Sequence, residues 1–155
     1  MRIPEPRVPK SIRVSSPRFA EAQPMPARYS CAGAGVSPPL VWTGVPAGTV
    51  SVALVVSDPD APRGTFLHWL LYDLPPGDGG VDEGTVPEQA REGENSGRRV
   101  GWYPACPPSG THRYVFSVYA LSAAPTAGNT DHVLDEIARH ATAWGSLTGT
   151  FSAVR

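Results

Sequence analysis

The sequence predicts a mainly β fold in one domain, on three observations. The chain has 155 residues, close to the usual size of a single domain. Only 17% of the residues are charged, which does not suit long helices exposed to water. The 16 glycines and 18 prolines far exceed average usage and indicate many turns between short strands. A helical bundle and a largely disordered chain are therefore excluded.

Short apolar runs separated by Gly and Pro clusters place the first elements. Residues 1–10 hold three prolines and no periodic pattern, so we expect an extended arm that frays in solution. The single domain then covers residues 11–155. Runs of β-branched and apolar residues predict strands at 11–19, 40–45 and 50–57, the last with apolar side chains on both faces.

Two longer runs predict central strands. Residues 66–74 (FLHWLLYDL) and 113–121 (RYVFSVYAL) are apolar on both faces, as expected of strands covered on each side. Between them, residues 75–99 are rich in Gly, Glu and Pro and nearly lack periodicity, which predicts a long functional or mobile loop.

One helix and one further strand complete the prediction. Residues 131–141 place their apolar side chains on one stripe, with acidic residues early and basic residues late. Thr130 is the expected N-cap. A break at Trp144 and Gly145 then precedes a last strand at 147–154.

Charge and hydropathy exclude several partners and locations. The net charge is −1 and the basic residues are scattered, so nothing attracts a nucleic acid or an anionic bilayer. The longest apolar run, 52–56, predicts no transmembrane helix, and residues 1–10 lack the apolar segment of a signal peptide. We therefore expect a cytoplasmic protein. In that reducing compartment, free thiols at Cys31 and Cys106 are favoured over a disulfide.

Groups able to do chemistry gather in two proline-stiffened loops. Asp58 and Asp60 follow the strand 50–57 in the first loop. His68 lies in the next apolar strand, where a buried imidazole needs a hydrogen-bond partner that Asp58 or Asp60 could provide. The second loop begins at Cys106 and leads to His112 in the other central strand. Two such loops predict one shared pocket.

Three alternatives to this pocket remain open. The histidines could be satisfied core residues, with aspartates that only cap turns. The carboxylates and imidazoles resemble a metal site in residue type, but their spacing matches no common zinc pattern. A small-ester hydrolase would use Ser109 or Cys106 as nucleophile with His112 as base, but there is no nucleophile elbow and no clear third partner.

Several motifs resemble the phosphatidylethanolamine-binding protein family in its small bacterial and archaeal form. The two signature stretches are DPDAPRGTFLHW at 58–69 and CPPSGTHRYVFSVYAL at 106–121. Further motifs at 29–31, 37–42 and 95–97 follow in the order that the family uses. The resemblance covers roughly residues 11–155. It implies a β-sandwich of two largely antiparallel sheets with Greek-key connections and a few short helices.

The resemblance also implies a function and a set of site residues. A non-enzymatic pocket would bind a small anion, phosphate or a phosphorylated headgroup, without cofactor or metal. An aspartate that holds one imidazole nitrogen leaves the other to donate to the anion, so we expect binding to weaken as pH rises. The implied ligand-binding residues are Asp58, His68, Cys106, Pro108, His112 and Tyr114, supported by Asp60, Pro62 and Trp102.

Departures from the family pattern and possible partners complete the expectations. Ala32 stands where many bacterial relatives carry Asp, Trp102 replaces a tyrosine, and the bulky stretch 103–105 is expected to narrow the rim of the pocket. A protein partner such as a kinase would contact residues 75–99. Exposed aromatics such as Tyr103 could instead form the face of a homodimer.

Overall fold

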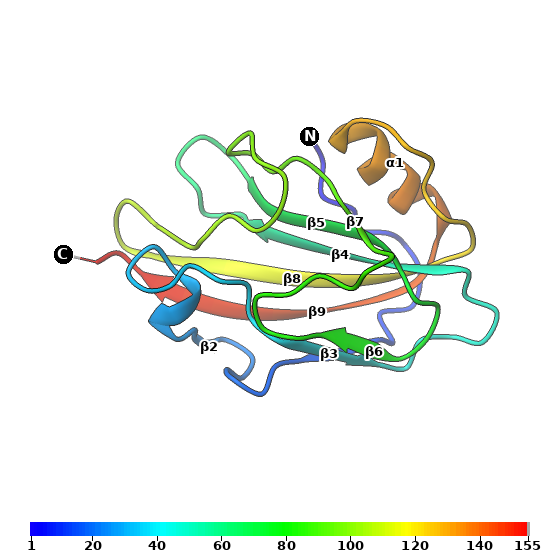
Figure 1. Ribbon diagram of the computed structural model, residues 1–155, viewed down its shortest axis with the longest axis horizontal. Coiled ribbons are helices and arrows are strands. Elements are labelled where there is room, and N and C mark those ends of the chain that lie inside the picture. Colours follow the sequence, from blue (N-terminus) through cyan, green and yellow to red (C-terminus); the bar gives the residue numbers. More distant parts are fainter. Residues whose placement is uncertain (155) are drawn as a thin grey trace.

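Strand β4 (Ser51–Asp58) lies at the centre of the structure, and all eight of its residues are buried. The computed structural model describes residues 1–154. In it, β4 pairs in antiparallel register with β5 (Phe66–Leu74) on one side and β8 (Thr111–Leu121) on the other (Figure 1). The complete large sheet has the order β2 (Gln23–Pro24), β9 (Ala141–Ser152), β8, β4, β5 and β7 (Arg91–Glu92). The β2–β9 pair is parallel, and the other pairs are antiparallel.

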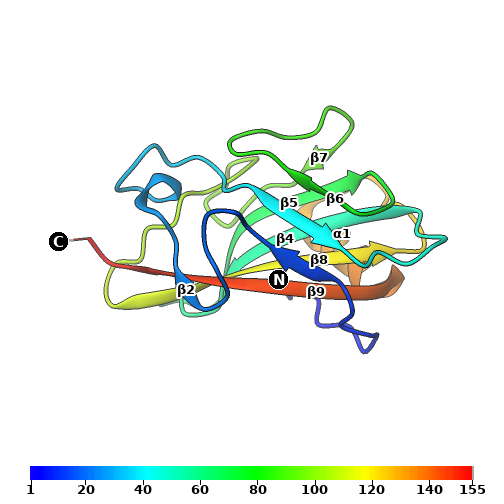
Figure 2. The same cartoon turned by 90° about the horizontal axis from the view of Figure 1, so that it is seen from below.

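A second, three-stranded sheet packs on one face of the large sheet. Figure 2 shows this small sheet and, behind the large sheet, the helix α1 (Thr130–His140). A short 3₁₀ helix, η1 (Ala27–Tyr29), precedes the first long connection. The predicted mainly β sandwich is therefore confirmed. The small sheet has the antiparallel order β1 (Arg13–Ser15), β3 (Leu40–Thr43) and β6 (Gly79–Val81).

The side chains of β4 divide the core into two clusters. Alternate residues of a strand point to opposite faces of the sheet. One set therefore packs between the two sheets and the other packs beneath α1. This arrangement confirms the predicted strands at 50–57, 66–74 and 113–121, whose two faces are both covered. The first set is Val52, Leu54 and Val56, and the second is Ala53 and Val55.

Two predicted strands are shorter than expected because the backbone turns early. The strand expected at 11–19 ends at Ser15, since the next serine side chain accepts a hydrogen bond from Arg18 N (3.1 Å) and the chain bends at Pro17. The strand expected at 40–45 ends before Gly44, which adopts a φ of 86°. Glycine reaches this left-handed region without steric cost.

The predicted break at Trp144 and Gly145 is wrong. β9 runs through both residues and pairs with β8 along its whole length. Gly145 is needed there because the chain at Ile12 crosses so closely that a Cβ at position 145 would collide with the Ile12 carbonyl oxygen. Ile12 N donates to Trp144 O (3.0 Å) at this crossing. The glycine therefore marks a close backbone approach and not the end of a strand.

The stretch 75–99 is not one long loop. It contains β6, which pairs with β3, and β7, which pairs with β5. Between them, Glu83 accepts hydrogen bonds from Arg28 Nε (2.7 Å) and from the hydroxyl of Tyr29 (2.6 Å). The two strands have three and two residues, too few to give a periodic pattern.

The helix begins one residue earlier than predicted, and its cap differs. Asn129 is the N-cap, with its side-chain oxygen accepting from His132 N (2.9 Å). The hydroxyl of Thr130 instead donates to Glu94 O (2.6 Å), which ties the helix to the segment after β7. Within residues 1–154, no helix has the length and apolar character needed to cross a bilayer.

The arm, residues 1–10, lies against the large sheet. Ile3 packs against the cluster beneath α1, and the buried hydroxyl of Tyr119 donates to Pro4 O (2.6 Å). Trp144 N donates to Pro9 O (3.1 Å). Further along the chain, Ala22 N and Met25 N donate to carbonyls of β9. The outer edge of β9 is thus paired with several short segments in turn.

We predict that Tyr119→Phe destabilises the fold by about 1 kcal/mol, because it removes one buried hydrogen bond and leaves the Pro4 carbonyl without its donor. Urea unfolding monitored by circular dichroism would measure the change. Tyr72→Phe is the matched control, since the Tyr72 ring is also buried and its hydroxyl has no hydrogen bond to any residue in 1–154. Equal losses in both variants would contradict a specific role for the arm.

Candidate functional site

A pocket of about 350 Å³ opens at the end of the sandwich where β4 ends and β5 and β8 begin. Its wall combines a few polar groups with many apolar ones. The residues that line it are Asp58, Ala61, Pro62, Phe66, His68, Tyr103, Pro104, Cys106, Pro107, Pro108, His112 and Tyr114. The two predicted loops therefore do meet in one pocket.

Asp58 and His112 form a buried pair at the floor of this pocket. Asp58 is the last residue of β4, and His112 is the second residue of the neighbouring β8. The Nδ1–H of His112 donates to Asp58 Oδ2 (2.6 Å), while Asp58 Oδ1 accepts from Asp60 N (2.8 Å). Both carboxylate oxygens are thus occupied. The Nε2 atom of His112 is the ring nitrogen left for a ligand.

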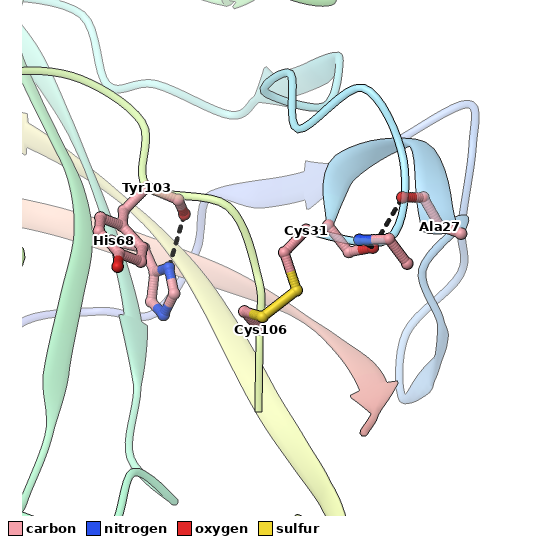
Figure 3. Close-up of a disulfide and its surroundings, with 7 residues drawn as sticks. Ala27, Cys31, His68, Tyr103 and Cys106 are labelled. Atoms are coloured by element: carbon pink, nitrogen blue, oxygen red, sulfur yellow. Dashed lines mark hydrogen bonds between the residues drawn. A yellow bond between two sulfur atoms is a disulfide. The ribbon is translucent and has the colours of Figure 1, made fainter. Parts of the chain in front are cut away.

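His68 is held by a backbone carbonyl and not by an aspartate. Its Nδ1 donates to Tyr103 O (2.7 Å), and Tyr103 N donates back to His68 O (2.9 Å) (Figure 3). The expectation that Asp58 or Asp60 would partner His68 is therefore wrong. The residues after β7 run beside β5 and bring the Tyr103 carbonyl to the imidazole, whereas Asp58 faces β8.

Burial sets the protonation state of His68. Removal from water lowers the pKa of its imidazole below the ordinary 6.5. The Tyr103 carbonyl and the nearby Asp58 raise this pKa, but by less than burial lowers it. The ring is therefore neutral at neutral pH. Because a carbonyl can only accept, the proton lies on Nδ1 and the lone pair lies on Nε2.

Tyr114 contributes an unpartnered hydroxyl. Its side chain is fully buried, and its oxygen has no hydrogen-bond partner within residues 1–154. The ring lies edge-on to His68, with 5.2 Å between the centroids. Burial raises the pKa of the phenol, so the hydroxyl keeps its proton. A buried donor without a partner is costly unless a ligand or water completes it.

Asp60 supports the site from outside the pocket. Its carboxylate accepts hydrogen bonds from Arg113 N (2.8 Å), Nε (3.0 Å) and an η nitrogen (2.8 Å). The side-chain and backbone donors of Arg113 lower the pKa of Asp60 to about 2. This ion pair fastens the first loop to β8 and also engages the guanidinium of the residue that follows His112.

Cys106 lines the pocket and forms a disulfide with Cys31, so the expectation of two free thiols is wrong. Ser30 and Ala105 form a β-bridge, and Cys31 N donates to Ala105 O (3.0 Å). These contacts bring the two cysteine Cα atoms to 5.4 Å, within the range a disulfide requires (Figure 3). Disulfides are typical of oxidising compartments. The cytoplasmic location stays a prediction.

The remaining predicted residues divide between the wall and its support. Pro62 and Pro108 line the pocket. Trp102 lies outside the lining and packs behind His68, stacked on Phe116. Ala32 lies in the exposed turn after Cys31 and is not a lining residue.

Three further wall residues, Phe66, Ala61 and Pro107, were not predicted from the sequence. Phe66 could have been found, because it precedes His68 by two residues in a strand and therefore points to the same face. Its ring lies 4.7 Å from the His68 ring and 5.1 Å from the Tyr103 ring.

The predicted alternatives of a metal site and of a nucleophile at Cys106 or Ser109 are not supported within residues 1–154. Among residues 1–154, no group of three or more His, Cys, Asp or Glu side chains could hold a metal ion. The sulfur of Cys106 is bonded to Cys31. Ser109 is exposed and outside the lining, and within the described chain it makes no hydrogen bond to His112.

Comparison with known proteins identifies the family. The family model described as "Phosphatidylethanolamine-binding protein" matches residues 15–152. The chain belongs to the phosphatidylethanolamine-binding protein family. The family resemblance predicted from the motifs is thereby confirmed.

Relatives within the family come from bacteria and archaea. A Mycobacterium tuberculosis protein named "Putative lipoprotein LppC" is 40% identical over 145 residues, which are 90% of this chain and 72% of that protein. The UPF0098 protein of Methanothermobacter thermautotrophicus is 37% identical over 142 residues, which cover 86% and 93% of the two chains.

Two solved structures of family members share this fold. The phosphatidylethanolamine-binding protein homologue CT736 of Chlamydia trachomatis has a TM-score of 0.86 and 33% identity. YbcL of Escherichia coli has a TM-score of 0.85 and 27% identity. Each comparison covers 94% of this chain and 99% of the other chain.

We predict that the double variant Cys31→Ser, Cys106→Ser is less stable than the parent by about 2–4 kcal/mol, because the disulfide restricts the unfolded chain across 75 residues of sequence. Urea unfolding with and without reductant measures the change, and the reductant should affect only the parent. Alkylation of the unreduced, unfolded parent should label no cysteine. Labelling at both positions would contradict the disulfide.

We also predict a pH dependence of stability that depends on His68. Its folded pKa is lower than the unfolded value of about 6.5, so the unfolded chain binds more protons below that pH. Stability from this group is complete above about pH 6.5 and is lost as pH falls. His68→Asn, which keeps a donor for Tyr103 O, should flatten this dependence in urea unfolding between pH 5 and 7. His132→Asn, on α1 and outside the pocket, is the control for the substitution itself.

Proposed function

We propose that this pocket binds a small oxygen-bearing anion, phosphate or a phosphorylated headgroup, without carrying out a chemical step. The observation that carries the proposal is the combination of Tyr114, His68 and His112 in one cavity. Within residues 1–154 the buried tyrosine hydroxyl has no hydrogen-bond partner, and each imidazole is held through Nδ1, which leaves Nε2 for a ligand. Buried groups of this kind need a ligand or water to complete their hydrogen bonds.

The geometry supports oxyanion binding through these three groups. An oxygen atom of the ligand can accept from the Tyr114 hydroxyl, which burial keeps protonated. Each imidazole Nε2 can also take part in a hydrogen bond to the ligand, as a donor where the ring is protonated and as an acceptor where it is neutral. Because Asp58 and the Tyr103 carbonyl fix the two rings, little conformational entropy is lost when the ligand binds.

The apolar wall of the pocket strengthens such hydrogen bonds. Phe66 and the proline-rich loops exclude water from the floor of the pocket, and a low local dielectric strengthens polar contacts. The family name refers to a phospholipid whose headgroup contains a phosphate, and free phosphoethanolamine carries that phosphate as a monoester.

A hydrolase is not supported by any contact in this site. Cys106 has no thiol to ionise, and Ser109 lies apart from the imidazole that would activate it. The function proposed for this family member is therefore binding alone.

We predict saturable NMR shifts of the His68 and His112 imidazole signals when phosphate or phosphoethanolamine is added, larger at pH 6 than at pH 8. A proton shared between an imidazole and the bound anion favours binding, whichever of the two groups supplies it, so affinity should fall as pH rises. Tyr114→Phe should weaken binding about fivefold through loss of one hydrogen bond, and His112→Ala should weaken it further. His132→Ala, outside the pocket, is the control and should bind as the parent does.

The proposal fails if the imidazole signals do not move at either pH. It also fails if His112→Ala binds as tightly as the parent while its circular dichroism spectrum shows the same fold.

A further inference from the structure

We infer that the pocket takes its anion as a partly protonated oxoacid, a phosphate monoester or a chemically similar acid, whose remaining acidic hydrogen is donated to Nε2 of His68. This inference rests on the function proposed for the same pocket and specifies the class and charge state of the ligand. It excludes sulfate esters and phosphodiesters as preferred ligands, since neither carries such a hydrogen near neutral pH.

The pocket presents both a hydrogen-bond donor and a hydrogen-bond acceptor to a ligand. His68 uses its Nδ1–H on Tyr103 O, at 2.7 Å, and His112 uses its Nδ1–H on Asp58 Oδ2, at 2.6 Å. Because the His68 ring is neutral, its Nε2 presents a lone pair and not a hydrogen. The Tyr114 hydroxyl is the one unpartnered buried donor among the lining side chains that the structure describes. A ligand with only acceptor oxygens leaves a ring nitrogen unmatched.

The electrostatics of the pocket also disfavour a doubly charged ligand. Across the described chain, no lysine or arginine lines the cavity, and the guanidinium of nearby Arg113 is held by Asp60. Asp58 places a carboxylate at the floor. A dianion brought into these surroundings would lose its hydration without meeting a compensating positive charge.

His68 is better suited than His112 to accept the ligand's hydrogen. The titratable groups that face it are Asp58 from β4, Tyr103 from the segment beside β5, and His112 and Tyr114 from β8. Burial outweighs the attraction of Asp58 and keeps the ring neutral. Figure 3 shows Nδ1 directed at the Tyr103 carbonyl, with the second ring nitrogen pointing away from it. That second nitrogen is a strong acceptor for an acidic hydroxyl.

A phosphate monoester matches this pattern in both polarity and size. Its second pKa is about 6, so the singly charged form is accessible at neutral pH. One oxygen can accept from Tyr114 while the acidic hydroxyl donates to His68. A cavity of about 350 Å³ is also much larger than one water molecule, which occupies about 30 Å³, and so leaves room for an ester carbon group beside Phe66.

Isothermal titration calorimetry of the full chain with three matched probes tests the inference. Methyl phosphate can carry the hydrogen, methyl sulfate has nearly the same shape without it, and dimethyl phosphate is a monoanion that also lacks it. At pH 6.5 we expect methyl phosphate to bind about tenfold more tightly than either control, as the cost of an unmatched buried acceptor predicts.

The protons taken up on binding provide a second readout. Titrations in buffers of different ionisation heat should show uptake of about one proton per methyl phosphate at pH 8, where the free ligand is a dianion, and almost none at pH 5, where it is already singly protonated. In His68→Asn, the affinity for methyl phosphate should lose most of its advantage over that for methyl sulfate. Tyr114→Phe should lower the affinity for both ligands and leave the ratio of the two affinities unchanged.

The outcomes separate this inference from the function on which it rests. If methyl sulfate binds as tightly as methyl phosphate, an imidazolium donates to both ligands. The inference is then overturned while anion binding stands. Uptake of about one proton by methyl sulfate as well as by methyl phosphate at pH 8 would have the same meaning. If none of the three probes binds, the proposed function itself fails.

Discussion

The register of β4 between β5 and β8 is the constraint on which the rest of the site depends. This strand is buried along its whole length. A shift of its register by one residue would therefore move the side chains of each core cluster to the opposite face of the sheet. The same register sets Asp58 opposite Phe66 of β5 and places it beside the start of β8, within reach of His112. The positions of the pocket groups thus follow from the packing of the core.

The two imidazoles show how neighbouring partners give one residue type different properties. His112 is paired with a carboxylate that is itself held by a backbone N–H, whereas His68 is paired with a neutral carbonyl in an apolar enclosure. Removal from water dominates at His68 and lowers its pKa. A pocket with one carboxylate and no lining lysine or arginine within residues 1–154 must recognise an anion by hydrogen bonds more than by net charge.

Much of this arrangement could be predicted from sequence, because side chains on a strand alternate with a period of two. The central strands and the meeting of two proline loops follow from that period and from the motifs. The partner of His68 could not be predicted, since it is a backbone carbonyl and any residue at position 103 supplies one. The Cys31–Cys106 bond was missed because the β-bridge at Ser30 joins segments far apart in the chain. Gly145 was misread because the same residue type serves turns and close contacts.

The segments that pair with the outer edge of β9 have a consequence for self-association. An unpaired strand edge is a template on which another chain can add a strand, and long exposed edges promote aggregation. Here the outer backbone groups of β9 form hydrogen bonds with the backbone of Pro9, Ile12, Ala22 and Met25 in turn. The carboxylate of Glu21 accepts a further hydrogen bond from Thr148 N. The strand among these partners, β2, has two residues, and the Pro9 and Ile12 contacts are single hydrogen bonds. The irregular path of the first 25 residues therefore keeps a twelve-residue strand from acting as a seed for intermolecular sheets.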